Sequence, residues 1–237
     1  MTPENETEPQ ALSGFRSGIL HGRRQGRRLR ETQSSLMEHL LPRYLIDRAG
    51  PLDQGKLFGH PVDAIRLEIG FGGGEHLAAQ ASQNPTIGYI GCEPFRNGIA
   101  RLLQQLDGEP WPNLRLYDGD AGEIIDRLET ASLAGVDLLY PDPWPKRRQR
   151  KRRFISAAML TRLARVMTSG SELHFATDID DYAGWAIERI EASPDFVWRP
   201  VSADDWLKPW HSWVETRYEA KAKREGRKPA YLTFVRL

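Results

Sequence analysis

The stretch from Leu138 to Arg153 holds the residues best suited to chemistry. A short apolar run ends in Pro141-Asp142-Pro143-Trp144-Pro145-Lys146, and seven of the eight residues from Lys146 to Arg153 are lysine or arginine. Prolines restrict the backbone and remove hydrogen-bond donors, so Asp142 and Trp144 lie in a stiff turn. A carboxylate and an indole beside a dense positive field indicate a polyanionic partner that also presents a planar group. A solvated charge run after a loop is the simpler alternative.

Four other acids share the position of Asp142, because each follows an apolar run typical of a strand: Glu68, Glu93, Asp120 and Asp178. Ligands of open α/β sheets bind outside the carboxyl ends of the strands. We therefore expect these carboxylates to gather at one edge of a sheet. Since Asp is common in ordinary turns, the repetition at successive strand ends carries this prediction.

The glycines of Gly70–Gly74 predict a loop whose backbone approaches a ligand closely. Glu75 stands where a dinucleotide fingerprint has its third glycine. Glu93 follows the loop by about 20 residues, the spacing of an acid that binds ribose hydroxyls in NAD or S-adenosylmethionine sites. Asp120 suits an adenine amino group and favours the methyl donor. An NAD-dependent oxidoreductase stays open as the alternative.

The pattern of apolar residues predicts the elements that position these side chains. Strands are expected at residues 64–69, 86–92, 114–117, 136–140, 172–177, 196–201 and 231–236. Helices are expected near residues 36–41 and over 75–83, 96–106, 154–167 and 181–191, with a further one ending at residue 128. This alternation predicts an α/β fold, with a mostly parallel seven-stranded sheet covered by helices on both faces. Residues 31–237 form one domain, and residues 1–30 are a flexible basic N-terminal tail.

Composition excludes several classes of protein. The 237 residues contain one cysteine, Cys92, which excludes a disulfide framework and fits a reducing cytoplasm. We expect no membrane span, and the six histidines lack the spacing of metal ligands, so no metal is expected. The net charge of +1 conceals basic clusters at residues 23–30, 146–153 and 221–228. A basic face on a nearly neutral protein favours a nucleic-acid partner.

Several short motifs recur together along the chain: Leu67-Glu68-Ile69-Gly70-Phe71-Gly72, Glu93, Asp120-Ala121, Pro141-Asp142-Pro143-Trp144-Pro145-Lys146, Ala176-Thr177-Asp178 and Thr216-Arg217-Tyr218-Glu219. In this combination the chain resembles the bacterial tRNA (guanine-N7-)-methyltransferase family from about residue 30 to the C-terminus. The glycine loop is shared with methyltransferases generally, whereas the Pro-Asp-Pro-Trp turn with a late Thr-x-x-Glu is specific. The residues Gly91-Cys92-Glu93-Pro94 and the Arg-rich tail depart from the family pattern.

The resemblance implies a Rossmann-like methyltransferase domain that methylates N7 of a guanine in the variable loop of tRNA, forming 7-methylguanosine. It implies three groups of residues. S-adenosylmethionine is expected to contact Glu68, Gly70, Gly72, Glu93, Asp120 and Asp142, with Asp142 also catalytic. The substrate is expected to contact Lys146, Asp178, Thr216, Arg217, Tyr218 and Glu219, and the RNA backbone to contact Arg148, Arg150, Lys151, Arg152 and Arg153.

Guanine N7 already carries a free lone pair, so methylation needs no base to remove a proton. The protein must mainly align the base with the methyl donor. Asp142 is expected to stabilise the cation that forms on the base, or to accept from the N–H groups that guanine presents. Asp178 is the other candidate for reading the base. A non-catalytic RNA-binding protein with a methyltransferase fold is a second alternative, and the sequence is compatible with a monomer or a homodimer.

Overall fold

The computed structural model describes residues 22, 24–50 and 52–237. Within them the chain forms one sheet of seven strands in the order β3-β2-β1-β4-β5-β7-β6. The strands are β1 (Ala64–Ile69), β2 (Ile87–Cys92), β3 (Leu114–Tyr117), β4 (Leu133–Leu139), β5 (Met167–Thr177), β6 (Phe196–Val197) and β7 (Ala230–Arg236). Strands β1 to β5 are parallel, while β7 runs antiparallel to β5 and β6 antiparallel to β7. The predicted mostly parallel sheet is confirmed.

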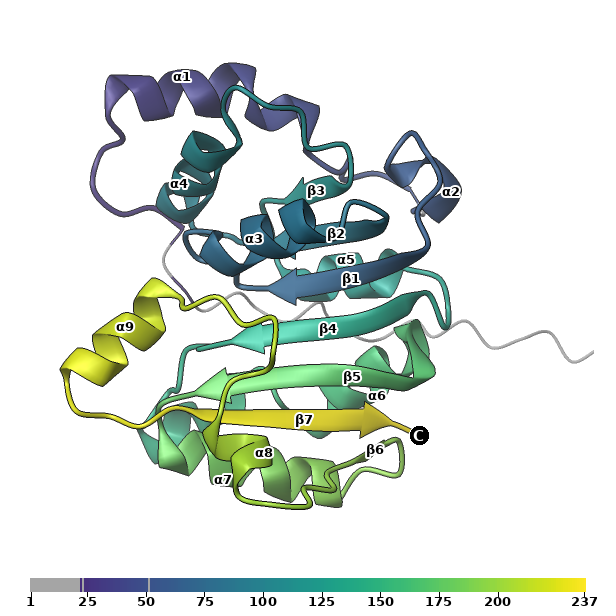
Figure 1. Ribbon diagram of the computed structural model, residues 1–237, viewed down its shortest axis with the longest axis vertical. Coiled ribbons are helices and arrows are strands. Elements are labelled where there is room, and N and C mark those ends of the chain that lie inside the picture. The colour runs from purple at the N-terminus through teal and green to yellow at the C-terminus, as the bar shows by residue number, and fades with distance from the viewer. Residues whose placement is uncertain (1–21, 23, 51) are drawn as a thin grey trace, which may run out of the picture.

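Helices cover both faces of this sheet (Figure 1). In the described part of the chain they are α1 (Glu31–His39), η1 (Leu41–Arg43), α2 (Gln54–Leu57), α3 (Glu75–Gln83), α4 (Arg96–Leu106), α5 (Ala121–Arg127), η2 (Arg147–Arg152), α6 (Ala157–Val166), α7 (Asp180–Glu191), α8 (Asp204–Leu207) and α9 (Arg217–Arg224). Helices α3 and α4 lie in front of the sheet, and α5, α6 and α7 behind it. Leu67, Ile90 and Leu173 have no exposed surface, as expected for strands buried on both faces.

Several element boundaries differ from the predicted ones for local reasons. The Ser156 hydroxyl accepts a hydrogen bond from the Met159 N–H at 3.3 Å, so α6 begins at Ala157 and not at residue 154. Strand β5 starts at Met167, which pairs with Leu133 of β4. Strand β6 keeps only two of the predicted residues 196–201, a stretch that includes Pro200, which has no N–H for the ladder.

The direction of the strands determines where a ligand site is expected. The carboxyl ends of β1, β4 and β5 lie at the left of Figure 1, next to α9. The sheet order reverses between β1 and β4, because β2 and β3 lie on one side of β1, and β4 and β5 on the other. This is the switch point at which open α/β sheets bind their ligands.

Most of the predicted tail, residues 1–21 and 23, lies outside the described residues. The described part packs on the start of α4 through three hydrogen bonds. The Arg24 carbonyl accepts from the Arg96 N–H at 3.0 Å, and Asn97 accepts from the Gly26 N–H and donates to the Arg27 carbonyl, both at 2.7 Å. Basic residues 24–30 therefore lie beside α4, whose first turn follows Glu93. None of the helices in the described ranges is both long enough and apolar enough to cross a membrane.

Candidate active site at the carboxyl ends of the strands

A cavity of about 780 Å³ opens at the switch point. The residues after β1, β2, β3 and β4 line it, together with the start of α6 and the Tyr218 side chain. Its wall carries three of the five carboxylates expected at this edge: Glu93, Asp120 and Asp142. Ile69, Leu138 and Met159 add apolar surface. The volume suits a ligand of nucleoside size or larger, held by a few acidic groups.

Glu93 is the most buried acid on the cavity wall, with 7% of its surface exposed. Its two carboxylate oxygens accept hydrogen bonds from the backbone N–H groups of Gly72 at 2.7 Å and Phe95 at 2.9 Å. Burial raises the pKa of Glu93 to about 7, although these two bonds act in the opposite direction. Each oxygen keeps a second lone pair, so the carboxylate can still accept from a ligand's hydroxyl groups.

Asp120 has a local role as well as a place on the wall. It precedes α5, and its Oδ1 accepts a hydrogen bond from the Gly122 N–H at 2.7 Å, which caps the helix. Burial raises the pKa of Asp120 above its usual value, with the cap bond acting against it. The second oxygen of this carboxylate is available to a donor group on a ligand.

The glycine loop lies against both Glu93 and the C-terminal segment. Gly72 has a φ of +57°, and a β-carbon there would come within 2.7 Å of the Tyr218 ring. A β-carbon on Gly98, in the first turn of α4, would overlap the carbonyl oxygen of Gly72. The backbone of the loop after β1 therefore meets that of α4 at a distance that only glycine allows.

The turn that carries Asp142 is strained at both ends. Tyr140 has a φ of +51° and Trp144 a φ of +42°, values that are uncommon for residues with large side chains. The Pro143 carbonyl accepts a hydrogen bond from Arg153 Nε at 2.8 Å, which ties the turn to the end of η2. Asp142 is open to the cavity, and partial burial there raises the pKa of its carboxyl. Backbone strain of this kind is concentrated at functional sites.

The basic run forms η2, which leaves most of its side chains facing solvent. Lys146, Arg147, Arg148 and Lys151 are exposed, whereas Arg150 and Arg152 are half-buried. Arg150 pairs with Asp181 at 2.6 Å, and the Arg152 guanidinium lies 4.9 Å from the centre of the Trp144 ring.

Arg153 differs from its neighbours, because its side chain has no exposed surface. It pairs with Asp181 and lies over the rings of Tyr182 and Trp185. The structure therefore places this residue under the Pro-Asp-Pro turn, and its position does not favour the RNA contact expected from the sequence.

The Thr216–Glu219 segment begins α9, with its outer residues buried and its middle residues more exposed. The Thr216 hydroxyl accepts from the Glu219 N–H at 3.2 Å and caps the helix. Glu219 has no exposed surface and accepts hydrogen bonds from Trp213 and Tyr231. Tyr218 is 45% exposed and lines the cavity. Arg217 pairs with Glu75 of α3, its Nε lying 2.8 Å from Oε1, which places the segment across the glycine loop.

Two of the expected carboxylates lie away from the cavity wall. Glu68 turns toward α3, where its Oε2 lies 2.8 Å from His76 Nδ1. Asp178 pairs with Arg227, beyond the end of α9. Neither residue lines this cavity, although Gly70 does and Gly72 reaches it through Glu93.

Phe95, Met159 and Arg162 also line the cavity, and sequence reasoning missed them. Phe95 directly precedes α4, and Met159 and Arg162 lie in α6; only the fold brings these two helices to the strand edge. The one sequence signal that could have pointed to any of them was the apolar stripe of the helix predicted over residues 154–167, which includes Met159. Cys92 is buried, and burial raises the pKa of its thiol, in keeping with an inert core residue. Among the described residues, no group of three or more histidine, cysteine, aspartate or glutamate side chains is arranged to hold a metal ion, and a metal-free site stays a prediction.

Residues 63–232 match a family described as "Putative methyltransferase". A tRNA (guanine-N(7)-)-methyltransferase of Chelativorans sp. (strain BNC1) is 52% identical over 91% of this chain and 94% of its own length. One of Nitrobacter hamburgensis is 48% identical over 98% of this chain and 91% of its own.

Among solved structures, the 16S rRNA methyltransferase KamB superposes with a TM-score of 0.59 and 17% identity, over 80% of this chain and 96% of that one. This likeness confirms the methyltransferase fold predicted from the sequence. The sequence relatives go further, because they match nearly the whole chain at about half identity. The chain belongs to the tRNA (guanine-N(7)-)-methyltransferase family.

Proposed function

We propose that the protein transfers the methyl group of S-adenosylmethionine to N7 of a guanine in the variable loop of tRNA. One observation carries the proposal beyond family membership: Asp142 on the cavity wall and the basic run that forms η2 belong to one continuous stretch of chain. A ligand in the cavity and an RNA on η2 would therefore meet at Asp142. Neither an NAD-dependent oxidoreductase nor a non-catalytic RNA-binding protein finds support among the relatives.

The residues of the cavity fit S-adenosylmethionine. Glu93 and Asp120 both line the cavity; Glu93 would accept from the two ribose hydroxyls, and Asp120 from the adenine amino group. Gly70 has a φ of +71° and lines the cavity, so its backbone can approach the ligand without a β-carbon in the way. Glu68 contributes indirectly, since it joins the end of β1 to the first turn of α3 through His76. When bound, S-adenosylmethionine supplies an electrophilic methyl group on a positively charged sulfur.

Asp142 is the residue we assign to the chemical step. Because guanine N7 has a free lone pair, no proton must be removed before methylation, and the product base carries a positive charge. A carboxylate fixed by a strained turn can stabilise this charge, or accept from the N–H groups of guanine, without reorganising. Its alignment of the base supplies the remaining effect, which is large when two reactants are held in line.

The tRNA would lie on the exposed basic residues of η2. Lys146, Arg148 and Lys151 face solvent, and Arg150 and Arg152 are partly accessible. Binding through such residues is electrostatic and depends on the shape of the RNA. In the Thr216–Glu219 segment, Arg217 and Tyr218 would contact the substrate, while Thr216 and Glu219 hold the backbone that presents them. Asp178, through Arg227, would fix the other end of α9. A cytoplasmic location is expected for an enzyme acting on tRNA.

Incubating the purified protein with methyl-labelled S-adenosylmethionine and bulk tRNA tests this function. Nucleoside mass analysis should find 7-methylguanosine that carries the label, and the absence of this labelled nucleoside would defeat the proposal. Asp142→Asn keeps the shape of the side chain and removes its charge. It should lower the single-turnover rate on the order of 10²-fold at saturating tRNA and donor, with a smaller change in the KM for tRNA. A wild-type single-turnover rate would make Asp142 a binding residue only.

A further inference from the structure

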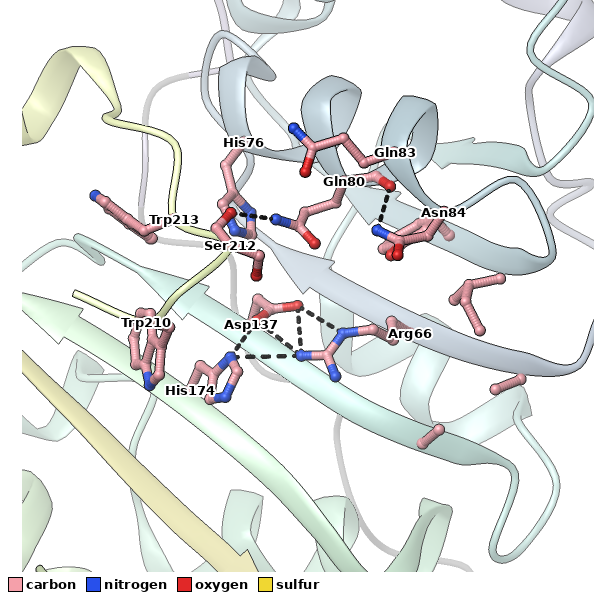
Figure 2. Close-up of a pocket in the computed structure, with 14 residues that line it drawn as sticks. Arg66, His76, Gln80, Gln83, Asn84, Asp137, His174, Trp210, Ser212 and Trp213 are labelled. Atoms are coloured by element: carbon pink, nitrogen blue, oxygen red, sulfur yellow. Dashed lines mark hydrogen bonds and ion pairs between the residues drawn. The ribbon is translucent and has the colours of Figure 1, made fainter. Parts of the chain in front are cut away.

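A second cavity, of about 350 Å³, lies on the sheet face that carries α3 (Figure 2). Among the described residues it shares no lining residue with the donor cavity. Side chains of β1, β4 and β5 form its floor, and its walls come from α3 and from the loop that joins α8 to α9, residues 208–216. This connecting loop leads directly into Thr216–Glu219, the proposed substrate-binding segment.

Charged side chains are paired with one another in the floor of this cavity. Asp137 is 3% exposed and accepts from Arg66 Nη2 at 3.0 Å. The two ring nitrogens of His174 lie 2.9 Å from Asp137 and 3.0 Å from Glu172. Burial alone would lower the pKa of His174, but the two carboxylates raise it above its usual value. A ring with an acid at each nitrogen is suited to carry both protons.

A second histidine stands above the floor on α3. His76 is 6% exposed, and its Nδ1 lies 2.8 Å from the buried carboxylate of Glu68. Burial opposes protonation of His76, yet the neighbouring carboxylate raises its pKa. Both histidines are therefore held in fixed orientations by acids on the strands.

Each histidine supports one tryptophan of the connecting loop. Trp210 stacks on His174 with ring centres 4.3 Å apart and planes 20° apart. Trp213 lies over His76 with centres 5.2 Å apart and planes 39° apart. An imidazolium beneath an indole face gains from the cation–π interaction as well as from packing. Figure 2 places the two tryptophans beside the two histidines, at the loop side of the cavity.

Hydrogen bonds prevent the tryptophan rings from sliding. Trp210 Nε1 donates to the Thr233 hydroxyl at 2.8 Å, and Trp213 Nε1 donates to Glu219 Oε2 at 2.6 Å. Between them, Gln80 of α3 donates to the Ser212 carbonyl at 2.8 Å. These three hydrogen bonds hold the connecting loop in one position over the sheet. Through Trp213 the loop is also joined to the buried Glu219.

From these contacts we infer that His76 and His174 are positioning residues for tRNA binding. Through Trp213 and Trp210 they fix the connecting loop, which in turn sets the place of Thr216–Glu219 against the glycine loop. The inference rests on the proposed role of that segment in binding tRNA. The charged groups of the floor are already paired with one another. What they act on is therefore the orientation of the histidine rings and of the loop that packs on these rings. An apolar floor would support packing equally well, whereas paired charges fix one orientation of each ring.

Substitutions in β5 and in the connecting loop, one on each side of the stacked rings, test the inference. His174→Ala removes the lower ring and Trp210→Leu removes the upper one. His174→Phe keeps a ring in the stack. Trp206→Leu is the matched control, because Trp206 belongs to α8 and packs on the main core instead. For each variant, the KM for tRNA, kcat, the donor Kd by calorimetry and the hydrogen exchange of residues 208–219 are measured.

His174→Ala and Trp210→Leu should raise the KM for tRNA about three- to tenfold, the size of one lost ring contact, and speed amide exchange in the connecting loop. The donor Kd should change by less than about twofold. His174→Phe keeps a ring in the stack but loses the contacts to Asp137 and Glu172, so its KM for tRNA should fall between those of His174→Ala and the wild type. Trp206→Leu should leave the KM unchanged. If His174→Ala and Trp210→Leu both left the KM for tRNA and the amide exchange unchanged, the inference would be overturned. It would also be overturned if these variants weakened donor binding as much as they raised the KM for tRNA.

Two outcomes are kept apart by this design. If His174→Ala does not fold, Trp210→Leu decides the matter from the loop side. If the wild-type protein methylates no tRNA, the proposed function fails, and the exchange of the connecting loop still decides whether the histidines hold it.

Discussion

Replacing Glu93 with glutamine tests the most buried acid of the donor cavity. Its pKa of about 7 is set by burial, with the backbone bonds opposing. A group with this pKa is about nine-tenths protonated at pH 6 and about nine-tenths ionised at pH 8. In the proposed site, the ionised form is the one that would accept from both ribose hydroxyls. Binding of S-adenosylmethionine to the wild-type protein should therefore tighten roughly tenfold between these two pH values.

Glutamine keeps the size of the side chain but loses its charge and one acceptor. The Glu93 oxygens accept from the N–H groups of Gly72 at 2.7 Å and Phe95 at 2.9 Å, and the new amide would set a donor against one of them. Losing a charge-assisted hydrogen bond costs about 1.5–3 kcal/mol. The variant should bind S-adenosylmethionine more weakly by this amount at pH 8 and show no dependence on pH between pH 6 and pH 8.

Titration calorimetry at pH 6, 7 and 8, at one ionic strength, measures both effects. Asp142→Asn is the matched control, since it removes another carboxyl of the same cavity and leaves Glu93 in place. The control should keep a pH-dependent step, moved toward lower pH because the Asp142 carboxylate contributes to the raised pKa of Glu93. A Glu93→Gln protein that kept the wild-type step would refute the assignment of this pKa, and one with wild-type affinity at pH 8 would remove Glu93 from the donor site.

Two further predictions concern the RNA face and the glycine loop. Replacing Arg150, Lys151 and Arg152 together with glutamine should flatten the salt dependence of tRNA binding, each lost phosphate contact lowering the log–log slope by about 0.7–0.9; filter binding across salt concentrations checks this, and an unaltered slope would mean that η2 does not contact phosphate. Gly98→Ala should destabilise the protein by about 1–3 kcal/mol and weaken donor binding, because its β-carbon meets the Gly72 carbonyl oxygen. Gly184→Ala in α7, where the β-carbon meets nothing within 4 Å, should be neutral or stabilising in the same thermal unfolding assay.

The sequence by itself determined the sheet and the edge at which the site lies. Runs of apolar residues separated by helical stripes predict parallel strands, and parallel strands bring their carboxyl ends together. Glu93 directly follows β2, and Asp120 and Asp142 lie in the loops that follow β3 and β4, so their meeting in one cavity follows from local patterns alone. The stiffness of the Asp142 turn was equally predictable from its prolines.

Only the tertiary structure decided which way the other polar side chains point. Successive residues of a strand face opposite sides of the sheet, so Ile69 lines the donor cavity while Glu68, one residue earlier, faces His76 on α3. In the sequence, nothing distinguishes Arg153 from its basic neighbours. In the structure its side chain is buried, because it pairs with Asp181 and packs on the aromatic rings of α7. The stacking of His174 on Trp210 joins β5 to a loop 36 residues away, a contact that no local pattern specifies because it depends on how the connecting loop crosses the sheet.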